Sequence, residues 1–185
     1  MAAYTTIDNP ELYFQTKTYS GNSGTNALTF DGSENMQPDL MWFKGRNFAD
    51  NHPVIDSVRG VTKAVYPDSN AAETTQTHYM TTIGSDGFTL DDSGIMNRTG
   101  RTYVAWCWKG GTTSVPSGST SDPGAVSFSA TSGFGIYRMT APASGDYVLK
   151  HGLGTTPDFI WVKDREATQK HMIWSDQFSN LTDDY

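Results

Sequence analysis

The chain contains two copies of one sequence pattern, and this repeat limits what it can fold into more than any other feature. Residues 38–52 read PDLMWFKGRNFADNH, and residues 157–171 read PDFIWVKDREATQKH. At a constant offset of 119 residues, the two segments share six identical residues, and three positions between them exchange one apolar residue for another. The identical residues are Pro38, Asp39, Trp42, Lys44, Arg46 and His52, matched by Pro157, Asp158, Trp161, Lys163, Arg165 and His171. Self-similarity at a fixed offset predicts two structural units built on the same plan.

Short apolar runs separated by glycine, asparagine, aspartate and serine recur along the chain. Such runs are typical of antiparallel strands joined by tight turns, because glycine and asparagine tolerate positive φ. We expect strands over residues 40–44, 88–90, 103–109, 135–139 and 159–163. The sequence therefore predicts an all-β fold, an antiparallel β-sandwich.

The segment over residues 110–124 differs from the rest, because Val115 is its only apolar residue besides proline. A segment with so little to bury is typical of a linker. We therefore expect a Gly/Ser/Thr/Pro linker over residues 110–130, between a first β-sandwich module at 19–109 and a second module at 131–185.

The second module is expected to be incomplete. Tyr185 stands at the repeat offset from Tyr66, whereas the first module continues beyond Tyr66 to Lys109. Missing strands would leave unpaired edges and an uncovered apolar face. We therefore expect the chain to be the N-terminal part of a longer polypeptide, or its second module to be completed by another chain.

Residues 1–18 precede the paired-strand pattern and carry large side chains that a free tail would not need. These side chains are Tyr4, Ile7, Leu12, Tyr13 and Phe14. They predict either an arm that docks on a partner through these residues or a first edge strand.

The repeated strand lacks a clean polar side. Alternation along a strand places Leu40, Trp42 and Lys44 on one face, and Met41 and Phe43 on the other. Because a two-layer sandwich buries only one face of each sheet, the outer face needs its own cover. Either a neighbouring module or subunit provides that cover, or Trp42 packs on its own loop beneath the stem of Lys44.

Composition and motifs point away from several classes of function. The 13 Lys and Arg against 20 Asp and Glu give a net charge of −7, which disfavours a nucleic-acid partner. No stretch approaches the roughly 18 apolar residues of a membrane span. The motifs GxSxG, HExxH and the phosphate-binding loop are absent from the sequence, so we expect no enzyme activity, no catalytic or metal-ligating residue and no cofactor. The acidic turns over residues 84–94 lack the spacing of a calcium loop and indicate hairpin turns.

Two local features have more than one interpretation. Asp56 and Arg59 form either a buried ion pair through the guanidinium fork or a surface pair in a turn. Cys107 is the only cysteine, so it cannot close a disulfide within the chain, and we expect it to be a small buried residue.

Several motifs in a fixed order resemble a known family. They are MQPDLMWFKGRN, DSVRGVTK, SDGFTL and TYVAWCWKGG, followed by a Ser/Thr/Gly linker and HGLGTTPDFIWVKDR. This series resembles a repeated module of marine bacteriophage structural proteins, which occurs in tail fibres and other virion-associated proteins, especially in phages of cyanobacteria. The opening AAYTTIDNPELYFQTKTYSGN is also similar to the start of such proteins.

The resemblance implies a concanavalin- or laminin-G-like jelly-roll sandwich in a virion protein located at the tail. It further implies a homotrimeric tail fibre involved in host attachment. The N-terminal part would anchor to other phage tail proteins, and distal parts would contact host surface glycans. The family supplies no catalytic residues. The second repeat carries DQFSN where the first carries DSVRG, so the role of Arg59 is not duplicated.

Three other functions remain open at the level of the sequence. One is a lectin-like carbohydrate-binding module, which would recognise host glycans through an exposed aromatic residue and turn Asp or Asn side chains. Another is a capsid decoration protein. The third is a polysaccharide depolymerase, which would need paired carboxylates in a cleft.

Overall fold

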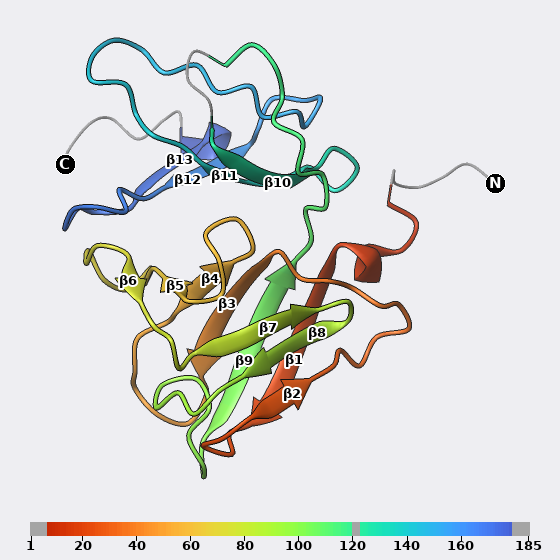
Figure 1. The fold of residues 1–185 in the computed structure, drawn as a ribbon. Coiled ribbons are helices and arrows are strands. Elements are labelled where there is room, and N and C mark those ends of the chain that lie inside the picture. Colours follow the sequence, from red (N-terminus) through yellow and green to blue (C-terminus); the bar gives the residue numbers. More distant parts are fainter. Residues whose placement is uncertain (1–6, 120–122, 179–185) are drawn as a thin grey trace.

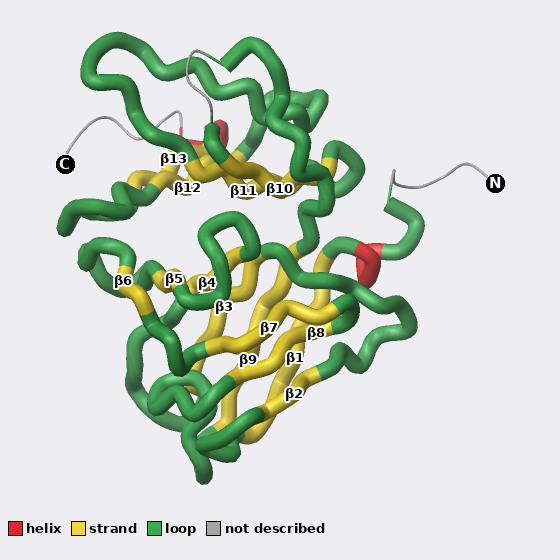
Figure 2. Tube along the Cα trace, in the orientation of Figure 1, coloured by secondary structure: helices red, strands yellow, loops and turns green. Residues whose placement is uncertain are grey.

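The computed structural model describes residues 7–119 and 123–178. Within them, the regular structure consists of thirteen strands and two short 3-10 helices, η1 (Pro10–Leu12) and η2 (Asp176–Phe178), and no α-helix occurs. All strand pairs within the sheets are antiparallel. The prediction of an all-β, antiparallel fold is therefore confirmed. Figure 2 shows how much of the chain runs in loops between short strands.

The first unit is built from two main sheets. One sheet has four strands in the order β1 (Phe14–Ser20), β9 (Thr102–Trp108), β3 (Leu40–Gly45) and β4 (Val54–Asp56). The other has three, in the order β2 (Asn26–Leu28), β8 (Gly87–Leu90) and β7 (Met80–Gly84). Figure 1 shows the three-stranded sheet lying across one face of the four-stranded sheet. A short pair, β5 (Lys63–Ala64) and β6 (Thr74–Thr75), lies at the margin.

The core of the first unit lies between these two sheets. Alternate residues of β3 and β9 point inward and are buried, whereas their neighbours are only half-buried. Phe43 of β3 meets Phe88 of β8 edge to face, with 5.4 Å between the ring centroids. Burial of large apolar side chains of this kind contributes about 1.5–3 kcal/mol each, so this layer holds the two sheets together. Its other buried members include Met41, Met80, Leu90, Tyr103, Ala105 and Cys107.

The second unit consists of two hairpins, which lie close together in the upper part of Figure 1. β10 (Ala125–Ser129) pairs with β11 (Phe134–Arg138), and β12 (Phe159–Val162) pairs with β13 (Met172–Ser175). A small core around the first hairpin contains Val126, Phe128 and Leu153, with Tyr137 packed against it. The second unit is therefore much less buried than the first.

All five strands expected from the sequence are present, with ends shifted by at most one residue. The expected boundaries between parts fit less well. The boundary between residues 18 and 19 falls inside β1, because residues 14–20 pair with β9. The predicted linker over residues 110–130 contains β10, because Val126 and Phe128 bury their side chains despite the serines around them.

The predicted turn over residues 85–87 joins β7 to β8. Gly87 has a φ of +107°, and a Cβ atom there would collide with the carbonyl oxygen of Leu28 on the neighbouring strand. Glycine is therefore required at this position both for backbone conformation and for space.

Candidate functional site

Beyond the core, the two units are in contact with each other. This contact covers the outer face of the four-stranded sheet, where Trp42 lies 5.9 Å from Trp106 and 6.0 Å from Trp161, measured between ring centroids. Trp108 stacks on Phe134 of the second unit at 6.2 Å. Of the two interpretations of this face, cover by a neighbouring module is the one that the structure shows. Aromatic pairs at these separations add to the energy of burial, so the units are held by direct packing as well as by the linker.

A cluster of charged residues closes one side of this contact. Arg59 donates from Nε to Asp56 Oδ2 at 2.5 Å and from Nη1 to Glu73 Oε2 at 3.1 Å. Arg165 of the second unit donates from Nε to the same Glu73 oxygen, also at 3.1 Å. We call Asp56, Arg59, Glu73 and Arg165 the Glu73 cluster. Asp56 is buried, and the side chains of Arg59 and Glu73 are only 8% and 9% exposed, so the buried form of the expected Asp56–Arg59 pair is confirmed.

The charge state of Glu73 follows from this arrangement. Burial alone would raise its pKa, but the hydrogen bonds from Arg165 and Arg59 outweigh burial and place the pKa below its ordinary value. Glu73 is therefore a carboxylate at neutral pH, and its charge is balanced from both units. No sequence pattern indicates this residue, because Glu73 stands in a polar stretch outside every motif.

A second polar contact involves His171. Its Nδ1 accepts a hydrogen bond from Trp161 Nε1 at 2.8 Å. Because an indole N–H can only donate, the imidazole hydrogen lies on Nε2, which faces the carbonyl oxygens of Tyr66 and Ser69 at 3.0 and 3.1 Å. Lys163 adds a hydrogen bond from Nζ to the carbonyl oxygen of Asn70 at 3.3 Å. The second unit thus binds the backbone of one loop of the first unit, over residues 66–70.

The residues that define the repeat therefore have different environments in the two copies. In the second copy, Trp161, Lys163, Arg165 and His171 all contact the first unit. In the first copy, Trp42 contacts the second unit, Lys44 donates to the carbonyl oxygen of its neighbour Gly45, and Arg46 is exposed.

The proline–aspartate pairs that begin each repeat also differ. Asp39 is buried and accepts hydrogen bonds from Ser57 Oγ at 2.6 Å and from the Gly110 backbone at 2.9 Å. Pro38 before it is fully buried. Asp158 is exposed and Pro157 is half-buried. The first aspartate thus anchors the chain where it leaves β9 toward the second unit.

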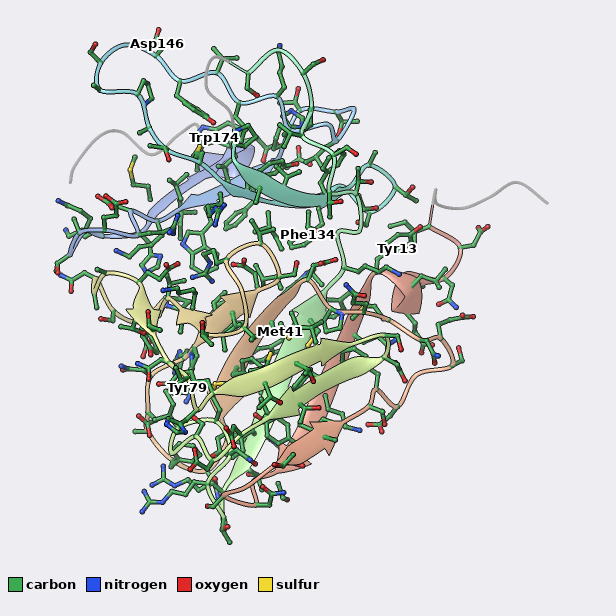
Figure 3. The ribbon with its side chains drawn as sticks, viewed as in Figure 1. Tyr13, Met41, Tyr79, Phe134, Asp146 and Trp174 are labelled. Atoms are coloured by element: carbon green, nitrogen blue, oxygen red, sulfur yellow. The ribbon has the colours of Figure 1, made fainter. Side chains whose placement is uncertain are left out.

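The residues expected to dock on a partner lie beside β1 where the structure describes them. Tyr4 is outside the described residues, and Ile7 is half-buried. Leu12 and Phe14 are exposed, although the Phe14 ring also contacts Trp108 at 5.0 Å between centroids. Tyr13, labelled in Figure 3, accepts a backbone hydrogen bond from Lys109 at 2.8 Å. Residues from Phe14 onward follow the second interpretation of this segment, an edge strand.

Few side chains in the described part are arranged for chemistry. His78, Asp91 and Asp92 lie close enough to hold a metal ion, but they are on the surface, with His78 Nδ1 3.1 Å from Asp92 Oδ1. Cys107 is buried, and burial raises the pKa of its thiol, so the nucleophilic thiolate is disfavoured. A polar hollow lies on the second unit, lined in part by Arg138, Arg165 and Glu166. No helix within residues 7–119 and 123–178 has the length and apolar character to cross a membrane.

Comparison with known proteins gives one match. A family model described as "Domain of unknown function (DUF7483)" matches residues 9–185. No curated protein and no solved structure matches the chain.

Proposed function

We propose that this chain, which belongs to the DUF7483 family of domains of unknown function, is a structural component of a bacteriophage virion. Within the virion, we assign it to the N-terminal, tail-anchoring part of a tail fibre involved in host attachment. The motifs MQPDLMWFKGRN, SDGFTL and TYVAWCWKGG and the repeat that follows them support this assignment through their resemblance to modules of marine phage proteins.

The proposal includes a finer description of the fold, in which both units are copies of one concanavalin- or laminin-G-like jelly-roll sandwich. The strand register supports this view. β3–β4 pairs Met41 with Ile55, and β12–β13 pairs Ile160 with Trp174, so each residue of the second pair stands 119 positions after its counterpart. The backbone of Ser57 donates to the Asp39 carbonyl, and that of Asp176 donates to the Asp158 carbonyl, at the same offset.

The observation that carries the functional proposal is the contact between the units. A fibre must transmit the position of its distal end to the tail, and this requires successive domains with a fixed orientation. Two aromatic contacts, the Glu73 cluster and the His171 hydrogen bonds join the two units in addition to the linker. Domains with small polar interfaces, by contrast, move relative to one another by default.

Localisation in intact virions tests the proposal. Antibody fragments raised against the purified chain would be bound to virions of a phage that encodes it and imaged by electron microscopy, with virions of an unrelated phage as control. We expect labels at the tail, in groups of three for a homotrimer. Labels on the capsid lattice, or no label on the particle, would overturn the tail-fibre assignment.

A glycan array with the purified chain separates this function from the lectin hypothesis. We expect no binding above background, because the host-contacting parts of a fibre are distal to its anchor. Binding to host surface glycans at micromolar concentration would favour the lectin-like function instead.

A further inference from the structure

The second unit exposes an apolar sheet face whose counterpart in the first unit is buried. Ile160 and Trp174 are 42% and 47% exposed, whereas Met41 and Ile55, the residues 119 positions earlier, are both 0% exposed. The hairpin β12–β13 carries most of the large apolar side chains that the described residues expose, namely Phe159, Ile160, Met172, Ile173 and Trp174.

The two hairpins can be compared residue by residue, because their strands pair in the same register. Met41 lies opposite Ile55, and Ile160 lies opposite Trp174. Neighbouring residues of a strand point to opposite faces. Trp161 contacts the first unit, so Ile160 and Trp174 lie on the face directed away from it. Figure 3 shows Met41 between the sheets of the first unit and Trp174 on the second.

In the first unit, two elements cover the equivalent face and edge. The hairpin β7–β8 lies over the face, where Phe88 meets Phe43. The strand β9 pairs with β3 along its whole length. Among the described residues, β12 pairs only with β13, so the edge that β9 occupies in the first unit is open in the second. An open edge beside an apolar face is suited to accept a further strand.

The contact between the units gives an independent reason to expect the same segment. Trp42 and Trp161 are equivalent residues and touch each other, as happens when two units are related by a two-fold axis. In a pair with two-fold symmetry, a contact between two different residues occurs twice, with the roles of the two units exchanged. Arg165 binds Glu73, so its equivalent Arg46 requires an equivalent of Glu73. Arg46 is exposed, and Glu73 belongs to the part of the first unit, residues 67–109, that also covers β3.

We propose that the β12–β13 face and the free edge of β12 are the docking site of a β-segment of the same type as residues 67–109. The segment belongs to the same polypeptide, downstream of the second unit. It adds a strand to β12, places alternate apolar side chains over Ile160 and Trp174, and supplies a carboxylate to Arg46. This inference concerns intramolecular assembly and does not depend on where the protein acts.

A fusion tests the proposal directly. Residue 185 is followed by a second copy of residues 67–109, so that Tyr185 takes the place that Tyr66 has before Pro67 in the first unit. Hydrogen exchange of the β12 amides is then compared with that of the unextended chain. We expect protection to rise by at least about tenfold, because an added strand removes the local opening of an edge. Binding of a hydrophobic dye should fall.

A matched fusion serves as control, with Phe88→Asp and Cys107→Asp made only in the appended copy. It should leave β12 exchange at the level of the unextended chain. Arg46→Gln provides a second readout, since it should lower the midpoint of urea unfolding in the fusion with the unmutated appended copy and leave that of the unextended chain unchanged. Equal exchange in the two fusions would overturn the proposal. Concentration-dependent protection of β12 in the unextended chain would also overturn it, since a second copy would then be the occupant.

A peptide keeps the proposal testable if the fusion does not fold. Residues 99–110, which include β9, are added in trans to the unextended chain, and exchange of the β12 amides is measured again. Protection that saturates with peptide concentration supports the docking site. No protection at millimolar peptide overturns it.

Discussion

Replacement of Glu73 by glutamine should weaken the contact between the units by a calculable amount. Glutamine keeps the volume and one acceptor oxygen but removes the charge that two arginines share. Hydrogen bonds to charged groups contribute about 1.5–3 kcal/mol and neutral ones about 0.5–1.5, so the buried Arg59 contact should lose about 1.5 kcal/mol. Arg165 has a side chain that is 34% exposed, so solvent screening reduces its share to about 0.5 kcal/mol.

The expected loss for Glu73→Gln is therefore about 2 kcal/mol in the free energy of unfolding. The buried Arg59 is not left unpaired, because it also donates to Asp56 and to the Val54 carbonyl. Urea unfolding followed by tryptophan fluorescence measures the loss. Glu166→Gln is the matched control, since Glu166 is exposed on the second unit near Arg165, and it should change stability by less than about 0.5 kcal/mol.

A double-mutant cycle isolates the part of this energy that joins the units. Arg165→Gln alone and combined with Glu73→Gln should give a coupling energy of about 0.5–1 kcal/mol. A loss for Glu73→Gln as small as that for Glu166→Gln, or a coupling energy of zero, would refute the assignment of Glu73 as the charge shared by both units.

Three further predictions follow from contrasts within the molecule. The stabilisation from ionised Glu73 is present above its ordinary pKa of about 4.5 and is lost as pH falls through its lower folded pKa, so acid unfolding of the parent should be steeper than that of Glu73→Gln; parallel curves would contradict this. Asp39→Ala should lower the free energy of unfolding in urea by about 2–3 kcal/mol, because it leaves buried donors unpaired. Asp158→Ala, at the equivalent position of the second repeat, should lower it by less than about 0.5 kcal/mol. Met41→Ala should lower the free energy of unfolding by about 2–5 kcal/mol, and Ile160→Ala by less than about 1 kcal/mol. Thermal unfolding of the two variants measures both losses. Equal losses would show that Ile160 is as well packed as Met41.

The all-β class and the main strands could be predicted because their signals are local. Alternation in residues 40–44 and 103–109, and the SDG turn at 85–87, depend on neighbours within a few positions. Two strands, β1 and β10, depend on contacts with residues that are more distant along the chain. For β1, an edge strand was one of two interpretations of residues 1–18, and its pairing with β9, far along the chain, decides in favour of the strand from Phe14 onward. β10 lies among serines, and its Val126 and Phe128 are informative only once the packing of Leu153 is known.

The candidate site was less predictable for the same reason. The repeat identified Trp42, Trp161 and Arg165 as noteworthy, and it did not indicate that two of them touch and that the third binds Glu73. A pattern in one chain segment specifies the hairpin that it forms, and tertiary contacts decide what that hairpin buries. Met41 and Ile160 share a register and differ in burial because the first has a sheet above it.

The two-fold pairing proposed for the units also limits how a fibre could be built from them. A contact between equivalent residues is closed, because each partner uses the same surface and none remains for a third unit. The Trp42–Trp161 contact therefore joins two units into a pair and cannot by itself extend a row of modules. A fibre that contains more units, or that forms a trimer, must therefore use another surface.

The described residues offer such a surface beside β1, where Leu12 and Phe14 are exposed at the edge of the four-stranded sheet. Substitution of both by serine should therefore reduce the mass of the proposed oligomer, measured by light scattering, to that of the 20.3 kDa chain. Urea unfolding should show that the chain stays folded, with a loss of stability from the contact between Phe14 and Trp108. An oligomer that survives this double substitution would place the assembly surface elsewhere.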